Sequence, residues 1–457
     1  MDTLLLSRLQ FGFTLSFHIL FPTLTIGLAV FLAILEGLWL RTHNPEYKRH
    51  YLFWVKIFTL TFGVGVVSGI VLSYEFGTNF SRFSAAAGSV IGPLMSYEVL
   101  TAFFMEAGFL GVMLFGWNRV GPKLHYAATI LVAIGTMLSA FWIISANSWM
   151  QTPAGTVLRD GVFYPVNWWH IVFNPSFPYR VIHMLLAAFL TTSVFIAGVS
   201  AWFLLRKQNV PFARRSFVFA LIAAAILAPI QIEAGDQSGL VADKYQPIKV
   251  AAIEGRWQSM AGAPLVLFAW PNEKTHHNDF ALEIPHGSSL IVKHSLQGVV
   301  TGLESVPPKD WPVVALVFWV FRIMVGLGLL MLALGWIGAW LLWRHRGRDL
   351  PRWFLRWCLW MTPAGFLATV AGWWTAETGR QPWIVYGLMR TADAWSPLEP
   401  QRVLYSFLAF IGIYAVVMWA YLYYLLKVIR KGPAETAPHP ELEHAPARHA
   451  FGGIENE

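Results

Sequence analysis

Charged side chains are scarce in this chain of 457 residues. Lys, Arg, Asp and Glu make up 13% of the sequence, about half of the roughly 25% found in soluble domains. Hydrophobic residues make up 56%, and apolar stretches of about twenty residues, long enough to cross a bilayer as helices, recur along the chain. A soluble globular fold is therefore excluded. We predict an all-α fold, that of a polytopic integral membrane protein.

Cysteine is nearly absent as well. Cys358 is the single cysteine, which excludes an internal disulfide and a metal site made of several thiolates. Because the chain has 14 histidines and 13 methionines, any metal would have to be held by imidazole, thioether or carboxylate groups.

Nine apolar segments are long enough to span a membrane. They cover Phe11–Leu40, Leu52–Phe76, Pro93–Trp117, Leu124–Ser148, Tyr179–Leu205, Ser216–Ile232, Trp311–Trp343, Trp353–Trp374 and Val403–Val428. Clusters of Lys and Arg follow the odd-numbered segments, whereas the alternate loops contain fewer basic residues. Because cytoplasmic loops carry the excess of basic residues, we predict that the N-terminus lies outside and the C-terminus lies in the cytoplasm.

These segments divide the chain into four parts. Residues 1–232 are expected to form six membrane helices, residues 233–310 an outer loop, and residues 311–431 three more membrane helices. The outer loop is polar at its start and then amphipathic. Residues 432–457 are rich in Pro, Ala, His and Glu, a composition that predicts a disordered cytoplasmic tail.

Two carboxylates interrupt the apolar segment Met95–Gly108, which reads MSYEVLTAFFMEAG. If this segment is an α-helix, Glu98 and Glu106 lie about 12 Å apart along the axis and about 80° apart around it. Both side chains can then point into the same part of the protein interior. A charged group within a bilayer costs roughly 2.5–3.5 kcal/mol or more. We therefore interpret the two acids as a proton or cofactor site; the alternative is a pair satisfied by neighbouring helices.

Other ligand-like side chains lie within the membrane segments or just past their ends. They are His18, His183, Arg322, Met324, Glu377 and Arg380. The predicted topology places them toward the outer face of the membrane. One metal ion does not use ligands so different in kind, but several hemes do. A His–Met pair holds a low-spin electron-transfer heme, and His or carboxylate leaves iron an open position. The guanidinium groups suit heme propionates.

Five motifs extend this interpretation. They are EFGTNF at Glu75–Phe80, YEVLTAFFMEAGFLG at Tyr97–Gly111, QPIKVAAIEG at Gln246–Gly255, FRIMVG at Phe321–Gly326 and GRQPW at Gly379–Trp383. With these motifs the sequence resembles subunit I of the cytochrome bd-type quinol oxidase family over nearly its whole length up to the tail. The resemblance implies an oxidoreductase of the bacterial inner membrane that reduces O2 to water with electrons from a membrane quinol.

Matched residue by residue, the motifs imply the positions of three hemes in this subunit. His183 and Met324 would hold the low-spin heme b. His18, Glu98 and Glu377 would serve the two high-spin hemes, which are a second heme b and a heme d, or a further heme b, that binds O2. The remaining cofactor contacts that we expect are Arg322, Trp373 and Arg380.

The resemblance also implies that quinol is oxidised in the outer loop, where Lys249 and Glu254 are the matching residues. It implies a second membrane subunit, subunit II, and often a very small third subunit. The outer loop resembles the short-loop branch of the family. That branch includes cyanide-insensitive oxidases, some of which carry heme b where others carry heme d.

The two carboxylates suggest how protons reach the oxygen site. Glu106 lies nearer the cytoplasm than Glu98, and the fourth segment offers the hydroxyl of Ser139 at the level of Glu106. Protons drawn from the cytoplasm would pass Glu106 while quinol protons leave outward, so proton motive force would arise without pumping. The competing prediction is a proton- or ion-coupled transporter with Glu98, Glu106 and His18 as its relay. It leaves the imidazole–thioether pair without a role.

Overall fold

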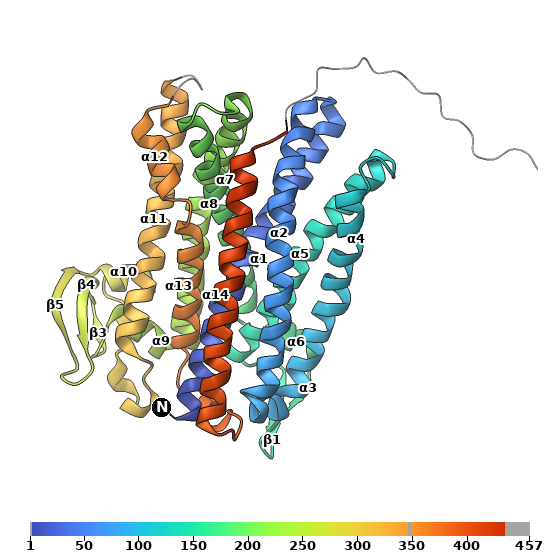
Figure 1. Ribbon diagram of the computed structural model, residues 1–457. Coiled ribbons are helices and arrows are strands. Elements are labelled where there is room, and N and C mark those ends of the chain that lie inside the picture. Colours follow the sequence, from blue (N-terminus) through green and yellow to red (C-terminus); the bar gives the residue numbers. More distant parts are fainter. Residues whose placement is uncertain (1, 346–349, 435–457) are drawn as a thin grey trace, which may run out of the picture.

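The computed structural model describes residues 2–345 and 350–434. In these residues the chain forms a bundle of long helices that run side by side (Figure 1). Eight of the described helices are long and apolar enough to cross a membrane, which confirms the predicted all-α, polytopic fold. The long helices are α1 (Thr3–Thr42), α2 (Pro45–Thr78), α3 (Ser81–Glu98) with its continuations η1 (Val99–Phe103) and α4 (Phe104–Phe115), α5 (Pro122–Gln151), α7 (Phe177–Leu205), α8 (Val210–Tyr245), α11 (Val314–Arg344) and α14 (Pro400–Lys431).

The span expected at 353–374 is built from two helices instead of one. α12 (Arg352–Trp360) and α13 (Ala364–Thr378) are separated by a turn at residues 361–363. Pro363 stands in this turn. A proline lacks the N–H that a continuing helix needs, but it is well suited to the start of a new one. With these two helices, each of the nine predicted segments is helical.

Two helices extend farthest beyond the ends that their apolar patterns predicted. α3 begins at Ser81 rather than at Pro93, because its less hydrophobic first half buries Phe83 in a cluster with residues of α5. α8 continues to Tyr245 rather than ending at Ile232. Its polar last turns are held by packing against α9 (Pro247–Glu254) and α10 (Gly287–Lys293). The predicted boundary at residue 232 therefore falls inside a helix.

The segment between α8 and α11 is the largest part of the described chain outside the long helices. Its strands form two antiparallel pairs: β4 with β5, and β3 with β6. It lies beside the bundle toward the end that carries the N-terminus (Figure 1). Besides α9 and α10, it contains β3 (Met260–Ala261), β4 (Leu265–Asn272), β5 (His277–Ile284), β6 (Val299–Val300), η2 (Leu303–Ser305) and η3 (Pro308–Asp310).

Two shorter connections complete the fold. One joins α5 to α7 through β1 (Thr156–Arg159), its antiparallel partner β2 (Val162–Pro165) and α6 (Trp168–Val172). The other joins α13 to α14 through β7 (Trp383–Val385), β8 (Met389–Arg390) and η4 (Thr391–Asp393). The predicted tail, 432–457, lies outside the described residues from 435 onward.

Helix α1 is central in the bundle. It packs against α2, α5, α7, α13 and α14. Its apolar side chains join a buried cluster in which Trp54 of α2 packs against Phe31 and Phe53, with ring centroids 6.0 and 5.1 Å apart. A Cβ on Gly27 would lie 2.5 Å from Cβ of Thr192, so a glycine is needed where α1 meets α7. The ligand-like side chains are thus held on rigid, closely packed helices.

Candidate functional site

Glu98 and Glu106 lie on either side of a π-helical segment, η1. Such a segment inserts extra residues into an α-helix and rotates the side chains that follow it. Both carboxylates face α5. Ser139 donates its hydroxyl to Glu98 at 2.7 Å, and a Cβ on Gly135 would lie 2.6 Å from Cγ of Glu106. Positions four apart lie on one helix face, so one face of α5 meets both acids.

The prediction that Ser139 lies at the level of Glu106 is wrong. The hydroxyl donates to Glu98 instead. The π-helical segment η1 lies between the two acids and shifts the register that a continuous α-helix would give. Glu106 is 6% exposed, and its Oε1 accepts no hydrogen bond from the described part of the chain. Trp142 of α5 donates to Thr101, within η1, at 2.9 Å.

Glu377, at the end of α13, is the centre of a buried polar cluster. It accepts hydrogen bonds from Asn147 at 3.0 Å and Gln151 at 3.1 Å, both on α5. Arg380 contacts the other carboxylate oxygen at 2.6 Å, and Arg180 of α7 lies 4.0 Å from the first. Glu377 and Arg380 were predicted from the sequence, but their partners were not. Asn147 and Gln151, four residues apart on an apolar helix, were the available signal.

Lys249 reaches this cluster from α9. Its ammonium donates to Gln151 at 2.5 Å and to Gln246 at 2.6 Å. Burial, reinforced by the positive charges of Arg180 and Arg380, holds the pKa of Lys249 well below its ordinary value. A residue of the predicted outer loop is therefore built into the cluster around Glu377.

Glu254, also on α9, points elsewhere. Five residues of α-helix separate two side chains by about 140° around the axis, so Glu254 lies on another side of α9 from Lys249. Burial raises the pKa of Glu254, although the positive charges of Arg322 and Arg256 oppose the rise. Its Oε2 accepts no hydrogen bond from the described residues. The two residues predicted to handle quinol are both buried, but the structure does not bring them together as a pair.

Arg322 of α11 binds backbone carbonyl groups. Its guanidinium donates to Ile253 at 2.8 Å, to Phe318 at 3.0 Å and, through Nε, to Val266 at 3.1 Å. Ile253 immediately precedes Glu254, so Arg322 fixes α11 to the part of α9 that carries this acid.

His183 and Met324 lie in a group of four helices, α7, α8, α11 and α13, that pack on one another. Gln231 of α8 places its amide nitrogen 3.3 Å from each ring nitrogen of His183. A Cβ on Gly235 would lie 3.2 Å from Cε1 of His183, and one on Gly372 would lie 2.7 Å from Sδ of Met324. Each predicted ligand thus has a glycine of a neighbouring helix beside it.

His18 repeats this arrangement between α1 and α2. Its Nδ1 lies 3.0 Å from Oγ of Ser68, and a Cβ on Gly69 would lie 3.0 Å from Cε1 of the ring. Trp374 of α13 donates to Ser16 at 2.7 Å, which connects α13 to the same turn of α1. The predicted residues therefore form separate groups, and α5 and α13 connect them.

The donor set of these groups fits hemes better than a bare metal ion. No group of three or more His, Cys, Asp or Glu side chains in the described part of the chain is placed to hold a metal, whereas a heme iron needs only one or two protein ligands. Arg380 is 4% exposed, and its Nε and Nη1 find no acceptor among the described residues; nor does Nε1 of Trp373. Unpaired buried donors of this kind suit the carboxylates of a heme.

Comparison with known proteins gives a consistent answer. The profile of the family described as cytochrome bd terminal oxidase subunit I matches residues 6–433. The chain is 36% identical to cytochrome bd ubiquinol oxidase subunit 1 of Bacillus subtilis strain 168, over 96% of each protein. It is 33% identical to cytochrome bd-II ubiquinol oxidase subunit 1 of Escherichia coli strain K12, over 95% of this chain and 97% of that one.

A solved structure shares the fold. The structure of bd oxidase from Geobacillus thermodenitrificans contains a chain that superposes on this one with a TM-score of 0.87 at 32% identity. The match covers 94% of this chain and 99% of that chain. The agreement in sequence and in structure over almost the whole length shows that the chain belongs to the cytochrome bd terminal oxidase subunit I family.

Proposed function

We propose that this chain is the heme-bearing subunit of a terminal quinol oxidase, a quinol:oxygen oxidoreductase of the bacterial inner membrane. Family membership supports this assignment, as do relatives named ubiquinol oxidase subunit 1. The observation that carries it is the burial of Lys249, from the segment beside the bundle, in the polar cluster around Glu377. This contact links the predicted quinol segment to the predicted heme residues.

The hemes would supply the redox chemistry, passing electrons from quinol to O2. His183 and Met324 would hold the low-spin heme b, from α7 and α11 of this group of four helices. His18, Glu98 and Glu377 would serve the two high-spin hemes, a second heme b and a heme d or further heme b. The unpaired donors of Arg380 and Trp373 would meet heme carboxylates. Arg322 is proposed as a further cofactor contact, in addition to its bonds with the carbonyls of the outer segment.

Quinol would be oxidised at α9. A carboxyl group with a raised pKa accepts a proton from a hydroxyl group most effectively near the pH at which the enzyme works, and burial places Glu254 in this class. Lys249 donates into the Glu377 cluster and would position the segment against the heme-binding helices. In this proposal Glu254 accepts the quinol proton, and Arg322 positions the backbone that carries Glu254.

Protons for water formation would follow the face of α5. Glu106 is buried with an unpaired oxygen, and Glu98 is bonded to Ser139 one turn farther along α5. We propose that Glu106 receives protons from the cytoplasmic side and passes them toward Glu98. The N-terminus and the outer loop, 233–310, would lie outside and the C-terminus inside, so that proton motive force arises without a pump. A transporter relay would leave His183 and Met324 without a role.

The chain would act in a complex. The family implies a second membrane subunit, subunit II, and we propose a very small third subunit as an optional partner. α14 is the least buried of the long helices. In addition, η1 exposes Leu100, and α4 exposes Phe104 and Phe115. Large apolar surfaces of this kind face lipid or other membrane helices.

Lys249→Met tests whether the burial of Lys249 in the cluster around Glu377 is needed for quinol oxidation. The change keeps the length of the side chain but removes the donor, so quinol oxidase turnover should fall by at least about tenfold while heme content stays normal. Lys244→Met is the matched control, because Lys244 is exposed at the end of α8. Normal turnover in Lys249→Met, or equal losses in both variants, would contradict the proposed role of the cluster.

A further inference from the structure

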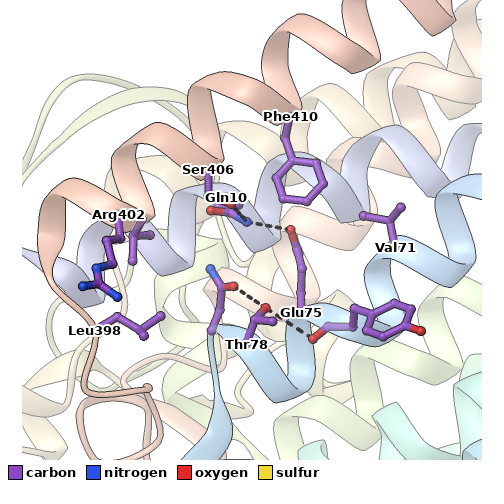
Figure 2. Close-up of a pocket in the computed structure, with 11 residues that line it drawn as sticks. Gln10, Val71, Glu75, Thr78, Leu398, Arg402, Ser406 and Phe410 are labelled. Atoms are coloured by element: carbon purple, nitrogen blue, oxygen red, sulfur yellow. Dashed lines mark hydrogen bonds between the residues drawn. The ribbon is translucent and has the colours of Figure 1, made fainter.

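A pocket of about 340 Å³ opens between α1, α2 and α14 (Figure 2). Its volume lies at the lower end of the range for small-molecule sites, roughly 300–1,000 Å³. Glu75 lies one turn before the end of α2, Arg402 in the first turn of α14, and Gln10 near the start of α1. The pocket therefore lies near one end of all three helices, at the depth where a membrane helix meets lipid headgroups.

Glu75 is a buried polar residue of the pocket and is 1% exposed. Its Oε1 accepts hydrogen bonds from Thr14 at 2.9 Å and from Gln10 at 3.2 Å. Its Oε2 accepts none from the described residues. A buried acceptor left without a donor costs about 1–3 kcal/mol, so this oxygen calls for an N–H or O–H group from a ligand.

A second unpaired acceptor lies beside the first. The amide nitrogen of Gln10 donates to Glu75 and, at 3.3 Å, to Ser406 of α14. These two bonds fix the orientation of the amide, and Oε1 of Gln10 remains buried without a donor in the described chain. Figure 2 shows the side chains of Gln10, Glu75 and Ser406 converging beneath Phe410. The pocket is thus lined by a carboxylate and an amide that each leave one buried acceptor oxygen without a donor among the described residues.

The rim of the pocket has the opposite charge. Arg402 lines it and is exposed. Among the described residues it pairs with its helix neighbour Glu399, at 2.9 Å. An exposed pair three residues apart is weak, so the guanidinium remains available to an anion. Val71 and Phe410 supply apolar walls between the two charges. A matching ligand carries a hydrogen-bonding cation at one end, an anion next to it, and apolar chains.

We propose that this pocket binds the headgroup of a phospholipid with a primary ammonium, of the phosphatidylethanolamine class. The ammonium N–H groups donate to Oε2 of Glu75 and Oε1 of Gln10, and the phosphate binds Arg402. The acyl chains lie along the apolar faces of α2 and α14. A quinol matches the site less well, because it has O–H donors but no anion for Arg402. A choline lipid has the same charges, but its quaternary nitrogen has no N–H donor.

Lipid titration of the purified oxidase complex, followed by native mass spectrometry, tests this site. Palmitoyl-oleoyl phosphatidylethanolamine should bind the wild-type complex at least about tenfold more tightly than the choline lipid with the same chains, as expected for two lost hydrogen bonds to a buried charged site. Glu75→Gln should remove this preference. Glu233→Gln, at an exposed position of α8, should retain it, and heme spectra report whether each variant is folded.

If Glu75→Gln does not assemble, a second variant still tests the proposal. Arg402→Gln changes an exposed side chain and should weaken both lipids alike, because both carry the phosphate. Equal affinity of the wild-type complex for the two lipids would overturn the proposal, as would an unchanged preference in Glu75→Gln. Displacement of the ethanolamine lipid by a quinol in the wild type but not in Glu75→Gln would assign the pocket to quinol instead.

Discussion

Ser139 and Glu98 are joined by a hydrogen bond of 2.7 Å across the interface of α5 and α3. One turn away on α5, Gly135 packs against Glu106. The π-helical segment η1 lies between the two acids and turns both toward the same helix face. Bulges of this kind often mark functional sites, and here the segment separates an acid with a partner from an acid without one.

Ser139→Ala should therefore act on Glu98 rather than on Glu106. The change removes the hydroxyl that donates to Glu98, so the absorption bands of the high-spin hemes should shift. Ser145→Ala is the matched control, because Ser145 lies on the same helix but donates to the carbonyl of Val172. Reduced-minus-oxidised difference spectra make the comparison. High-spin bands that stay the same in Ser139→Ala would remove Glu98 from the heme site.

Glu106→Gln should separate chemistry from proton supply. The amide has the size of the carboxyl group but cannot carry a proton, so steady-state oxygen consumption should fall at least about tenfold. Heme bands and chemical reduction should survive, since Glu106 is not proposed as a ligand. Glu98→Gln should disturb the high-spin spectrum itself. Full turnover in Glu106→Gln would show that protons take another route, and loss of heme would place Glu106 in the cofactor site.

Met324→Leu tests the low-spin heme. The substitution roughly conserves volume but removes the thioether, so the low-spin band should shift or vanish. Met331→Leu serves as the control, because Met331 is buried in the apolar core on the same helix. Difference spectra of the two purified variants decide the matter. If both retain the wild-type low-spin band, Met324 is not a ligand.

The pH dependence of quinol oxidase turnover should show the titration of Glu254. Because burial raises its pKa, this carboxyl group stays protonated, and unable to accept the quinol proton, to a higher pH than an exposed glutamate with a pKa of about 4.3. Quinol oxidase turnover should thus rise with pH through the raised pKa, and Glu254→Gln should lower turnover and flatten this limb. A rising limb that persists in the variant would assign the titration to another group.

The same group should affect stability with the opposite slope. A pKa raised in the folded state means that the folded protein holds the proton more tightly than the unfolded chain does. This contribution is complete below about pH 4.3, the ordinary value of the unfolded chain, and it is lost as pH rises through the folded pKa. Thermal unfolding of Glu254→Gln should accordingly depend less on pH than that of the wild type.

The membrane helices were predictable because their signal is local. About twenty apolar residues in a row can satisfy their backbone groups only as a helix in a membrane, and each predicted span is helical. Helix ends and helix breaks that depend on tertiary contacts were not predicted. The polar end of α8, up to Tyr245, is held by α9 and α10, and the break before α13 depends on Pro363. Neither changes the apolar pattern enough to be read from it.

In the candidate site as well, features with a local sequence signal were predictable, and long-range contacts were not. The acids and histidines stood out because they lie in apolar helices, but their partners did not. Arg180 lies near Glu377 only because α7 and α13 pack together. Glu36 and His125, 2.6 Å apart and fully buried, are separated by most of three helices in the sequence. Long-range pairs of this kind depend on helix packing, which residue spacing within a single helix does not report.

The claim that this chain is the heme-bearing subunit of a quinol oxidase is tested most directly by the quinol-dependent oxygen consumption of the purified, detergent-washed complex, measured on samples of known heme content. We expect a red-brown protein with sharp dithionite-reduced bands, both low-spin and high-spin heme, and oxygen consumption that starts when quinol is added. A matched His183→Ala complex should lose the low-spin band and the activity together. A colourless wild-type protein, or one that binds heme but consumes no oxygen with quinol, would contradict the account.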